Sequence, residues 1–280
     1  MSEIWKPKVW LAVGQGIFLQ PFVFLYLHKP VIFVVYLLLS VSANLVDWPF
    51  AIPLSLIFVV ICPIHAYLIA KRYNRHSARK WYSRWWGMLT VGVGIFLSIF
   101  LIRSVFYDWF SVQEDSMSPY LDPQDTLIVK KYGYGGYGAY GISLMNTGLS
   151  DDIELQRGKV YAFYPPDVDN NIVYVKRLIA KPGDSVEIQG NQISINGLPL
   201  KTTLLTKNTD FSLYEEVSDG ITYQIKIKGA EPFFPDVSLI IPDDSYFFLG
   251  DNRDNSADSR LWGTLPSTRF VGEVVYVFNQ

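Results

Sequence analysis

Two residue types are missing from most of this chain, and their absence narrows the chemistry available to it. No histidine and no cysteine occurs from position 107 to the end of the 280-residue sequence. The three histidines and the single cysteine, Cys62, lie in the apolar first third, and one cysteine excludes an intramolecular disulfide. Nucleophilic catalysis in the later part therefore cannot use Ser-His-Asp or Cys-His. A serine there would need lysine as its general base.

Acidic residues are almost absent from the first part of the chain. Residues 1–106 hold ten Lys or Arg but only two acids, Glu3 and Asp47, whereas residues 107–280 hold fourteen Lys or Arg and twenty-four acids. Half of all residues are hydrophobic. We therefore expect a membrane region with basic flanks at 1–106 and an acidic, water-exposed domain at 107–280. An acidic domain is a poor candidate for nucleic-acid binding, which needs clustered positive charge.

Four long apolar runs in the first region are candidates for membrane-spanning helices. A helix needs roughly 17 to 25 residues to cross the hydrocarbon core of a bilayer. The runs cover residues 9–27, 30–46, 48–70 and 85–102. The first contains Gln20 and Pro21 and the second is short, so these two could instead form a hairpin that does not cross fully. The sequence thus predicts up to four hydrophobic helices.

The loop at 71–84 indicates the orientation of these helices. It carries six basic residues and no acid, and positive loops are retained on the cytoplasmic side. The fourth helix would then deliver the residues after Phe106 to the outer face. Aromatic residues flank that helix, as is typical of a membrane interface: Trp85, Trp86, Tyr107, Trp109 and Phe110.

After Asp108 the pattern changes to short runs rich in Val, Ile, Tyr and Phe, which predict strands. We expect strands at 125–132, 160–164, 172–179, 185–188, 192–195, 222–227, 246–249 and 271–278. Gly190-Asn191 and Asn196-Gly197 are turn signals. The Gly/Tyr-rich stretch 132–141 predicts a flexible loop that carries aromatic side chains, or a long irregular loop without a special role. Residues 198–242 interrupt the strand pattern and predict a smaller inserted subdomain.

Two residues in this β domain could form a nucleophile and base. Ser116 follows the fourth helix by about a dozen residues and stands before Met117-Ser118-Pro119. Lys176 lies inside the apolar run 172–179. Burial of an ammonium group lowers its pKa and can leave a neutral amine that accepts a proton. The alternatives are that Ser116 is an ordinary turn residue and that Lys176 snorkels from a half-exposed strand.

A third element, GDNRDNSADSR at 250–260, is too polar to be core. Such a run can supply a hydroxyl that holds an amine in place and an Asp/Arg pair that braces it. A solvated charged loop is the alternative.

The three elements in this order resemble the bacterial type I signal peptidases, the Ser/Lys membrane proteases. Residues 174–177 (YVKR) and 181–184 (KPGD) resemble the lysine box of the family, and 250–260, followed by Leu261-Trp262-Gly263, resembles its C-terminal box almost letter for letter. The resemblance covers about residues 116–266. It implies Ser116 as nucleophile and Lys176 as general base. Ser256 would orient the lysine amine, and Asp258 and Arg260 would form a bracing ion pair.

The resemblance also implies supporting roles for further residues, and this sequence differs from the family at two positions. Asp251 and Arg253 would be structural members of the C-terminal box, and Met117 would help to hold the substrate face. Gln124 stands where the family commonly has glycine. Glu114 stands where some members have a serine that assists the oxyanion hole, and an ionised carboxylate cannot donate a hydrogen bond.

The resemblance implies a fold of N-terminal transmembrane helices followed by a mostly-β extracytoplasmic catalytic domain of the signal-peptidase and SOS-repressor type. It implies removal of signal peptides from exported preproteins at the bacterial inner membrane, with no metal or organic cofactor. Phospholipid and the secretion translocon would be partners. Two alternatives stay open: a specialised peptidase for pilin or conjugation substrates, and a non-catalytic membrane receptor or self-cleaving regulator.

Overall fold

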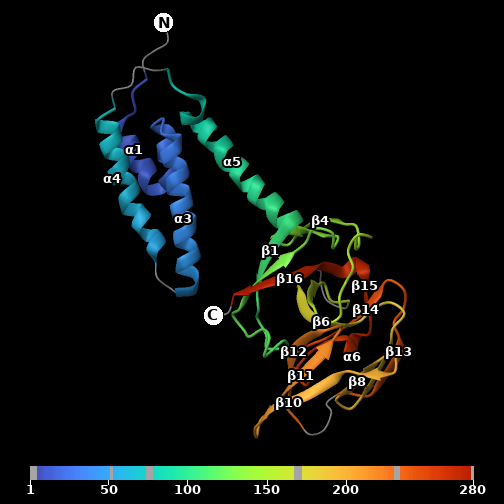
Figure 1. The fold of residues 1–280 in the computed structure, drawn as a ribbon. Helices are drawn as coiled ribbons and strands as arrows, with labels where there is room; N and C mark the ends of the chain where they lie inside the picture. The colour runs from blue at the N-terminus through green and yellow to red at the C-terminus, as the bar shows by residue number, and fades with distance from the viewer. Residues whose placement is uncertain (1–4, 51–52, 74–77, 167–171, 230–233, 279–280) are drawn as a thin grey trace. The chain divides into compact units, whose positions relative to one another are not determined.

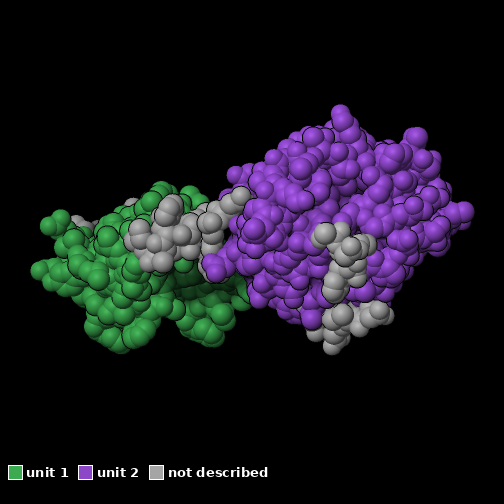
Figure 2. All heavy atoms as spheres, turned by 90° about the horizontal axis from the view of Figure 1, so that it is seen from below, with its two compact units in different colours: residues 1–99 green, residues 100–280 purple. Residues whose placement is uncertain are grey.

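The chain divides into two compact units, residues 1–99 and 100–280 (Figure 2). The computed structural model describes residues 5–50, 53–73, 78–166, 172–229 and 234–278, without the side chains of 45–50. The boundary lies a few residues before the one expected at 106/107. The last helix of the first unit, α5 (Trp85–Leu101), and the π-helical turn after it (Ile102–Phe106) carry the chain from one unit into the other.

The first unit is helical. Its elements before α5 are α1 (Val9–Phe18), η1 (Gln20–Phe22), α2 (Val23–Tyr26), α3 (Pro30–Phe50), η2 (Leu54–Leu56), α4 (Ile57–Lys71) and η3 (Trp81–Ser83). Among the described residues, two helical stretches, Leu54–Lys71 and Trp85–Phe106, are by length and composition apolar enough to cross a membrane. The first predicted run is broken, because Gln20 takes a left-handed conformation (φ 41°) before Pro21, which lacks an N–H. Of the two structures expected for residues 9–27, a continuous helix is therefore excluded, and the alternative of a hairpin that does not cross the membrane fully stays a prediction.

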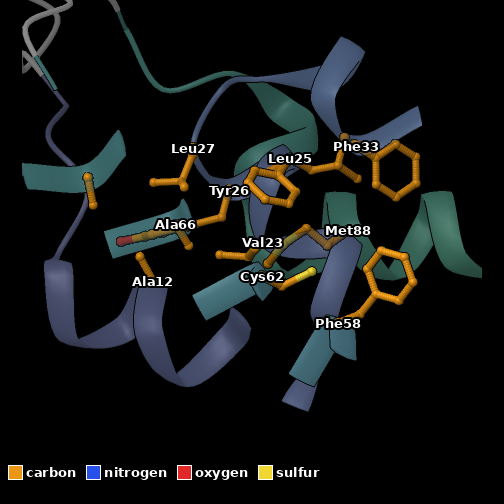
Figure 3. Close-up of a cluster of buried hydrophobic side chains, with 12 residues drawn as sticks. Ala12, Val23, Leu25, Tyr26, Leu27, Phe33, Phe58, Cys62, Ala66 and Met88 are labelled. Atoms are coloured by element: carbon orange, nitrogen blue, oxygen red, sulfur yellow. The ribbon is translucent and has the colours of Figure 1, made fainter. Parts of the chain in front are cut away.

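Small residues allow α1 and α4 to pack closely. A Cβ on Gly16 would lie 2.6 Å from the Cα of Pro63, so only glycine permits this approach. Cys62 is fully buried in the same interface, as a small hydrophobe, together with Ala12, Val23 and Ala66 (Figure 3).

The second unit is built on a seven-stranded antiparallel sheet (Figure 1). In spatial order its strands are β1 (Tyr107–Ser111), β2 (Thr126–Lys130), β16 (Phe270–Phe278), β5 (Val160–Phe163), β6 (Tyr174–Ala180), β14 (Ser245–Leu249) and β15 (Leu265–Pro266). The β5 strand is buried throughout and β6 almost so, which explains why β5 is entirely apolar and why β6 is apolar apart from Lys176 and Arg177. Position 176 therefore lies in the middle of the core sheet, opposite Tyr161.

Three smaller sheets complete the unit. One contains, in order, β13 (Val237–Ile240), β7 (Ser185–Gln189), β8 (Gln192–Ile195) and β9 (Leu198–Pro199), and the two predicted turns join β7 to β8 and β8 to β9. Another contains β10 (Lys201–Lys207), β11 (Ser212–Ser218) and β12 (Ile221–Ile227). The last pairs β3 (Gly136–Ala139) with β4 (Ile142–Asn146). The short elements α6 (Ser259–Trp262) and η5 (Ser267–Arg269) precede β16.

The Gly/Tyr-rich stretch is not an irregular loop, contrary to expectation. Its residues 136–141 form β3 and the turn of the β3–β4 hairpin, and β3 lies against the π-helical turn Ile102–Phe106. The guanidinium of Arg103 stacks over Tyr140 at 4.1 Å and over Trp109 at 3.8 Å. The buried ammonium of Lys131 bonds to the carbonyl of Gly138. These contacts give the hairpin a fixed attachment.

The sequence suggested that the strand pattern is interrupted in residues 198–242, but the structure has strands there. The described residues of this region contain five strands, β9 to β13, of which the sequence revealed only β12. The β13 strand returns to pair with β7 in the neighbouring sheet. The separate part is the three-stranded sheet of residues 201–227. Whether that sheet is an independent subdomain stays a prediction.

Candidate active site

Ser116 lies in the loop between β1 and β2, and hydrogen bonds fix this loop at both ends. At its base, the N–H of Gln124 donates to the carbonyl of Val112 (2.9 Å), and the N–H of Val112 donates to the carbonyl of Asp125 (2.8 Å). After the serine, the N–H of Leu121 donates to the carbonyl of Met117 (3.0 Å). The chain turns tightly here, so Ser116 has a defined position.

Met117 holds this turn to the body of the domain. Its side chain is buried in a cluster with Leu121, Leu127 and Val129 and also lines the cleft beside Ser116. It is thus both a core residue and a part of the cleft wall. Its expected role toward substrate stays a prediction.

Lys176 reaches Ser116 from β6, an interior strand of the main sheet. Its Nζ lies 2.6 Å from Ser116 Oγ, within hydrogen-bond distance. The side chain is 4% exposed. Burial lowers the pKa of Lys176 to about 8, although the negative charges of Asp258, Glu114 and Asp251 oppose the shift. Since an ordinary lysine titrates near 10.4, a useful fraction of this amine is neutral near pH 8 and can accept the serine proton.

The start of the C-terminal box closes over the nucleophile from the other side. A Cβ on Gly250 would lie 2.5 Å from the carbonyl oxygen of Ser116 and 2.2 Å from Ser256 Oγ, so a side chain there would displace both. The N–H of Asn252 donates to the Ser116 carbonyl (3.2 Å), and its amide group donates to the Asp115 carbonyl (3.1 Å). Sequence reasoning missed these contacts.

Ser256 is buried in this box at 5% exposure. Within the described part of the chain its Oγ has no hydrogen-bond partner. The expected hydrogen bond from Ser256 to the lysine amine is therefore not formed in this structure. The assignment of Ser256 as the residue that orients Lys176 stays a prediction.

The expected ion pair between Asp258 and Arg260 is formed at 2.7 Å. Asp258 is fully buried, caps α6 through the Arg260 N–H and accepts the N–H of Gly250 at 3.1 Å. Arg260 also donates to the carbonyl of Arg253 (2.5 Å). The pair therefore holds the ends of the box together beside Ser256.

The other two box residues form buried ion pairs with residues outside the box. Asp251 accepts hydrogen bonds from two guanidinium nitrogens of Arg177, Nε at 2.7 Å and Nη2 at 2.5 Å. Arg177 directly follows Lys176, the candidate general base. Arg253 pairs with Glu216 of β11 (2.5 Å), which also accepts the Tyr223 hydroxyl at 2.7 Å. Their predicted structural role agrees with this geometry. The sequence contained no signal for Glu216, because its partner lies far along the chain.

An apolar cleft of about 340 Å³ opens in front of the Ser116–Lys176 pair. Its walls come from the end of β1, the loop that follows it, β2, and β6 with the residues just before it. They include Phe110, Val112, Leu127, Val173 and Val175. Such a cleft accommodates small apolar side chains of an extended peptide.

Glu114 is exposed at the mouth of this cleft. It acts on Lys176 through its charge, which raises the pKa of the lysine. Within the described residues, no group of three or more His, Cys, Asp or Glu could hold a metal ion.

Comparisons with known proteins identify the family of this chain. The family model for signal peptidases, peptidase S26, matches residues 84–279. The chain therefore belongs to that family. It is 29% identical over 235 residues to the signal peptidase I of Buchnera aphidicola subsp. Baizongia pistaciae, covering 66% of this chain and 73% of that protein.

A second relative points to the same family. The signal peptidase I of Rickettsia felis is 30% identical over 218 residues, covering 69% of this chain and 78% of that protein. A crystal structure of a signal peptidase I from Enterococcus faecalis matches 44% of this chain and 98% of that chain at 25% identity, with a TM-score of 0.32.

Proposed function

We propose that this chain is a membrane-bound endopeptidase that removes N-terminal signal peptides from exported preproteins through a Ser116/Lys176 dyad. The observation that carries the proposal is the 2.6 Å approach of Lys176 Nζ to Ser116 Oγ at the wall of an apolar cleft. Membership of the signal peptidase family supports the substrate class.

The reaction begins when Lys176, as the neutral amine, takes the proton of Ser116 while Oγ attacks the carbonyl at the end of the signal peptide. The resulting lysine ammonium then protonates the leaving amine as the peptide bond breaks. An acyl-enzyme forms on Ser116. A water molecule, deprotonated by the same lysine, attacks this ester and releases the signal peptide with a free carboxylate.

The developing oxyanion would bind the backbone N–H of Ser116. A second donor has no obvious source at position 114, since an ionised glutamate only accepts hydrogen bonds. Loss of one such donor costs a factor of about 10² to 10³ in rate in other serine enzymes. The entrance of the cleft therefore differs chemically from that of relatives that have a serine at the position of Glu114.

The cleft is suited to an extended peptide with small residues at −1 and −3. Because β1 and β6 contribute its walls, main-chain pairing with these segments would hold the peptide in line with Ser116. The volume of about 340 Å³ is shared by several substrate positions and leaves little room for large side chains.

The helix at 85–106 would anchor this domain at the bilayer that also holds the signal peptide. The basic loop at 71–84 supports a cytoplasmic position for the start of that helix and an outer position for the catalytic domain. Enzyme and substrate would then share one membrane surface. Phospholipid and the translocon are the partners expected on this basis.

The test is cleavage of a detergent-solubilised preprotein by the full chain and by Ser116→Ala and Lys176→Met. Wild type should release a product whose mass corresponds to cleavage after the signal peptide, and neither variant should. Asp243→Asn, an exposed substitution away from the cleft, serves as the folded control and should cleave normally. Equal activity of both dyad variants would contradict the proposed site.

A further inference from the structure

Glu216 of β11 is a buried carboxylate that lies outside the sequence motifs of the site. It is 1% exposed and stands directly opposite Tyr223 of β12, whose hydroxyl donates to Glu216 Oε1 at 2.7 Å. Arg253 donates to both carboxylate oxygens, from Nη2 to Oε1 at 2.5 Å and from Nη1 to Oε2 at 3.2 Å. A two-bonded pair of this kind fixes the orientation of the side chains as well as their distance.

The backbone beside Arg253 is held to the same three-stranded sheet. The N–H of Lys226 in β12 donates to the carbonyl of Asp251 at 2.8 Å, and the N–H of Arg253 donates to the carbonyl of Lys226 at 2.9 Å. The segment 251–253 therefore runs along β12 as a short additional strand. The pair of Glu216 and Arg253 locks this segment from the side-chain end.

Asn252, in the middle of that segment, holds the loop of the nucleophile. Its backbone N–H donates to the carbonyl of Ser116 (3.2 Å), and its side-chain amide donates to the carbonyl of Asp115 (3.1 Å). Because Asn252 is covalently joined to Arg253, a displacement of the Arg253 backbone moves both contacts. One series of contacts thus leads from Glu216 to the nucleophile.

A second series of contacts leads from Glu216 to the base. The hydroxyl that Glu216 accepts belongs to Tyr223, and the ring of Tyr223 lies 4.0 Å from the guanidinium of Arg177, where it attracts the cation. Arg177 directly follows Lys176 in β6. Since successive side chains of a strand point to opposite faces, Arg177 holds the strand from the face opposite to Lys176.

The charges of this buried network balance one another. Arg177 pairs with Asp251 and Arg253 pairs with Glu216, and each of the four side chains is at most 4% exposed. Removal of Glu216 alone would leave the cation of Arg253 buried without its ion-pair partner, which lowers stability. A loss of stability in such a variant therefore does not by itself show a role in cleavage.

We propose that Glu216 is a positioning residue, which fixes the separation of Ser116 and Lys176 from the three-stranded sheet. The inference rests on the proposed function, because it concerns the same dyad. Glu216, Tyr223 and Arg253 are not among the described residues that line the catalytic cleft. Their effect should therefore fall on the reaction of bound substrate and not on its binding.

The test measures kcat and KM of the full chain in detergent on a fluorogenic peptide with small residues before the scissile bond. Glu216→Gln removes the charge and keeps the length of the side chain. We expect kcat to fall by about 10- to 100-fold with KM unchanged, since a misplacement of about 1 Å can cost 10² in rate. Both constants are taken on the alkaline plateau of each pH profile, where Lys176 is neutral in every variant.

Glu215→Gln is the matched control for this substitution. Glu215 precedes Glu216 in β11, so its side chain lies on the opposite face of the three-stranded sheet. The control removes the same charge one position away and should leave kcat and KM at their wild-type values. An equal fall of kcat in both variants would overturn the inference, because the net charge of the sheet would then be the cause.

A double variant separates positioning from stability. Glu216→Gln combined with Arg253→Met removes both charges, so no buried charge is left without a partner. We expect the melting temperature, lowered in each single variant, to recover in the double variant. We expect kcat to stay as low as in the slower single variant, because both residues act on Ser116 through the same contacts. The double variant also serves if a single variant fails to fold.

The outcomes separate the inference from the proposed function. Recovery of kcat together with the melting temperature in the double variant would overturn the inference, because Glu216 would then act through stability alone. Cleavage by Glu216→Gln with the wild-type kcat, counted per folded molecule by circular dichroism, would also overturn it. Both of these results leave the proposed function intact, whereas failure of wild type to cleave the peptide would contradict the two proposals together.

Discussion

Lys176 Nζ and Ser116 Oγ lie 2.6 Å apart, although 60 positions separate them in the chain. The serine lies in the loop between β1 and β2, whereas the lysine lies in β6, an interior strand of the main sheet. The strand therefore sets the position and the burial of the base, and the loop brings the nucleophile to it.

The burial of Lys176 predicts the pH dependence of cleavage. Only the neutral amine accepts the serine proton, and the pKa of Lys176 is lowered to about 8. We expect kcat/KM to rise with pH through an apparent pKa near 8, with the enzyme largely inactive two pH units below. A pH profile of peptide cleavage by the full chain measures this. A profile that is flat from pH 6 to 9 would contradict the assignment of the base.

Substitution of Glu114 should shift this pH profile. Its negative charge raises the pKa of Lys176, together with the charges of Asp258 and Asp251, against the larger effect of burial. Glu114→Gln removes one of these charges, so the pKa should fall further and the rising limb should move to lower pH. An unchanged limb, or one displaced to higher pH, would show that Glu114 does not act on the lysine.

The same buried lysine should reduce the stability of the domain. At neutral pH the folded chain keeps a poorly solvated charge, and Lys176→Met removes it. A pKa lowered from 10.5 to about 8 corresponds to a penalty on the order of 3 kcal/mol. We expect the inactive variant to unfold at a higher temperature than wild type at pH 7.

The destabilisation caused by the buried Lys176 depends on pH. Below about pH 8 lysine is protonated in both the folded and the unfolded chain, so the full penalty applies. Between about 8 and 10.5 the folded chain has lost the proton and the unfolded chain still binds it, so wild type becomes more stable as pH rises. The difference in melting temperature between Lys176→Met and wild type should therefore shrink over that range. A constant difference would argue that packing alone causes it.

Gln124 takes a backbone conformation that suits glycine. Its φ is 83°, a left-handed value that costs a residue with a Cβ about 1 kcal/mol or more. The relief of this strain offsets the added freedom that glycine gives the unfolded chain, so Gln124→Gly should leave the domain more stable, by about 1 kcal/mol, than the same change at a position without a positive φ, and should leave the position of Ser116 unchanged. Denaturant unfolding of the two proteins measures the difference.

Gln156→Gly is the matched control, because Gln156 is an exposed loop residue without a positive φ. There the added freedom of the unfolded chain should lower stability by about 0.4 to 1 kcal/mol. If both glycine variants lose stability equally, the strain assigned to Gln124 is absent.

Patterns within single segments carried most of the information available from the sequence. The buried strand β6 is apolar on both sides of Lys176 and Arg177, so both the strand and the unusual lysine inside it could be predicted. The pair of Asp258 and Arg260 was predictable because both residues belong to one short motif. The site as a whole followed from the resemblance that this motif and the lysine box carry.

Features that depend on distant partners could not be predicted in this way. Arg253 is a charged residue in a polar run, and only the fold shows that it is buried against Glu216 of another sheet. The strand β10 is exposed along its whole length, so it has no alternation of apolar and polar positions to reveal it. In the β3–β4 hairpin, glycine and tyrosine alternate, and glycine hides the strand signal because it ordinarily weakens strands.

The most direct test of the Ser116/Lys176 account is to trap its covalent intermediate. Wild type, Ser116→Ala and Lys176→Met are mixed with a signal-peptide substrate, quenched in acid during the first turnovers, and digested for mass spectrometry. The account predicts an added mass equal to the segment before the scissile bond, on Ser116, in wild type alone. An adduct on another residue, or turnover by Ser116→Ala at the wild-type rate, would contradict it.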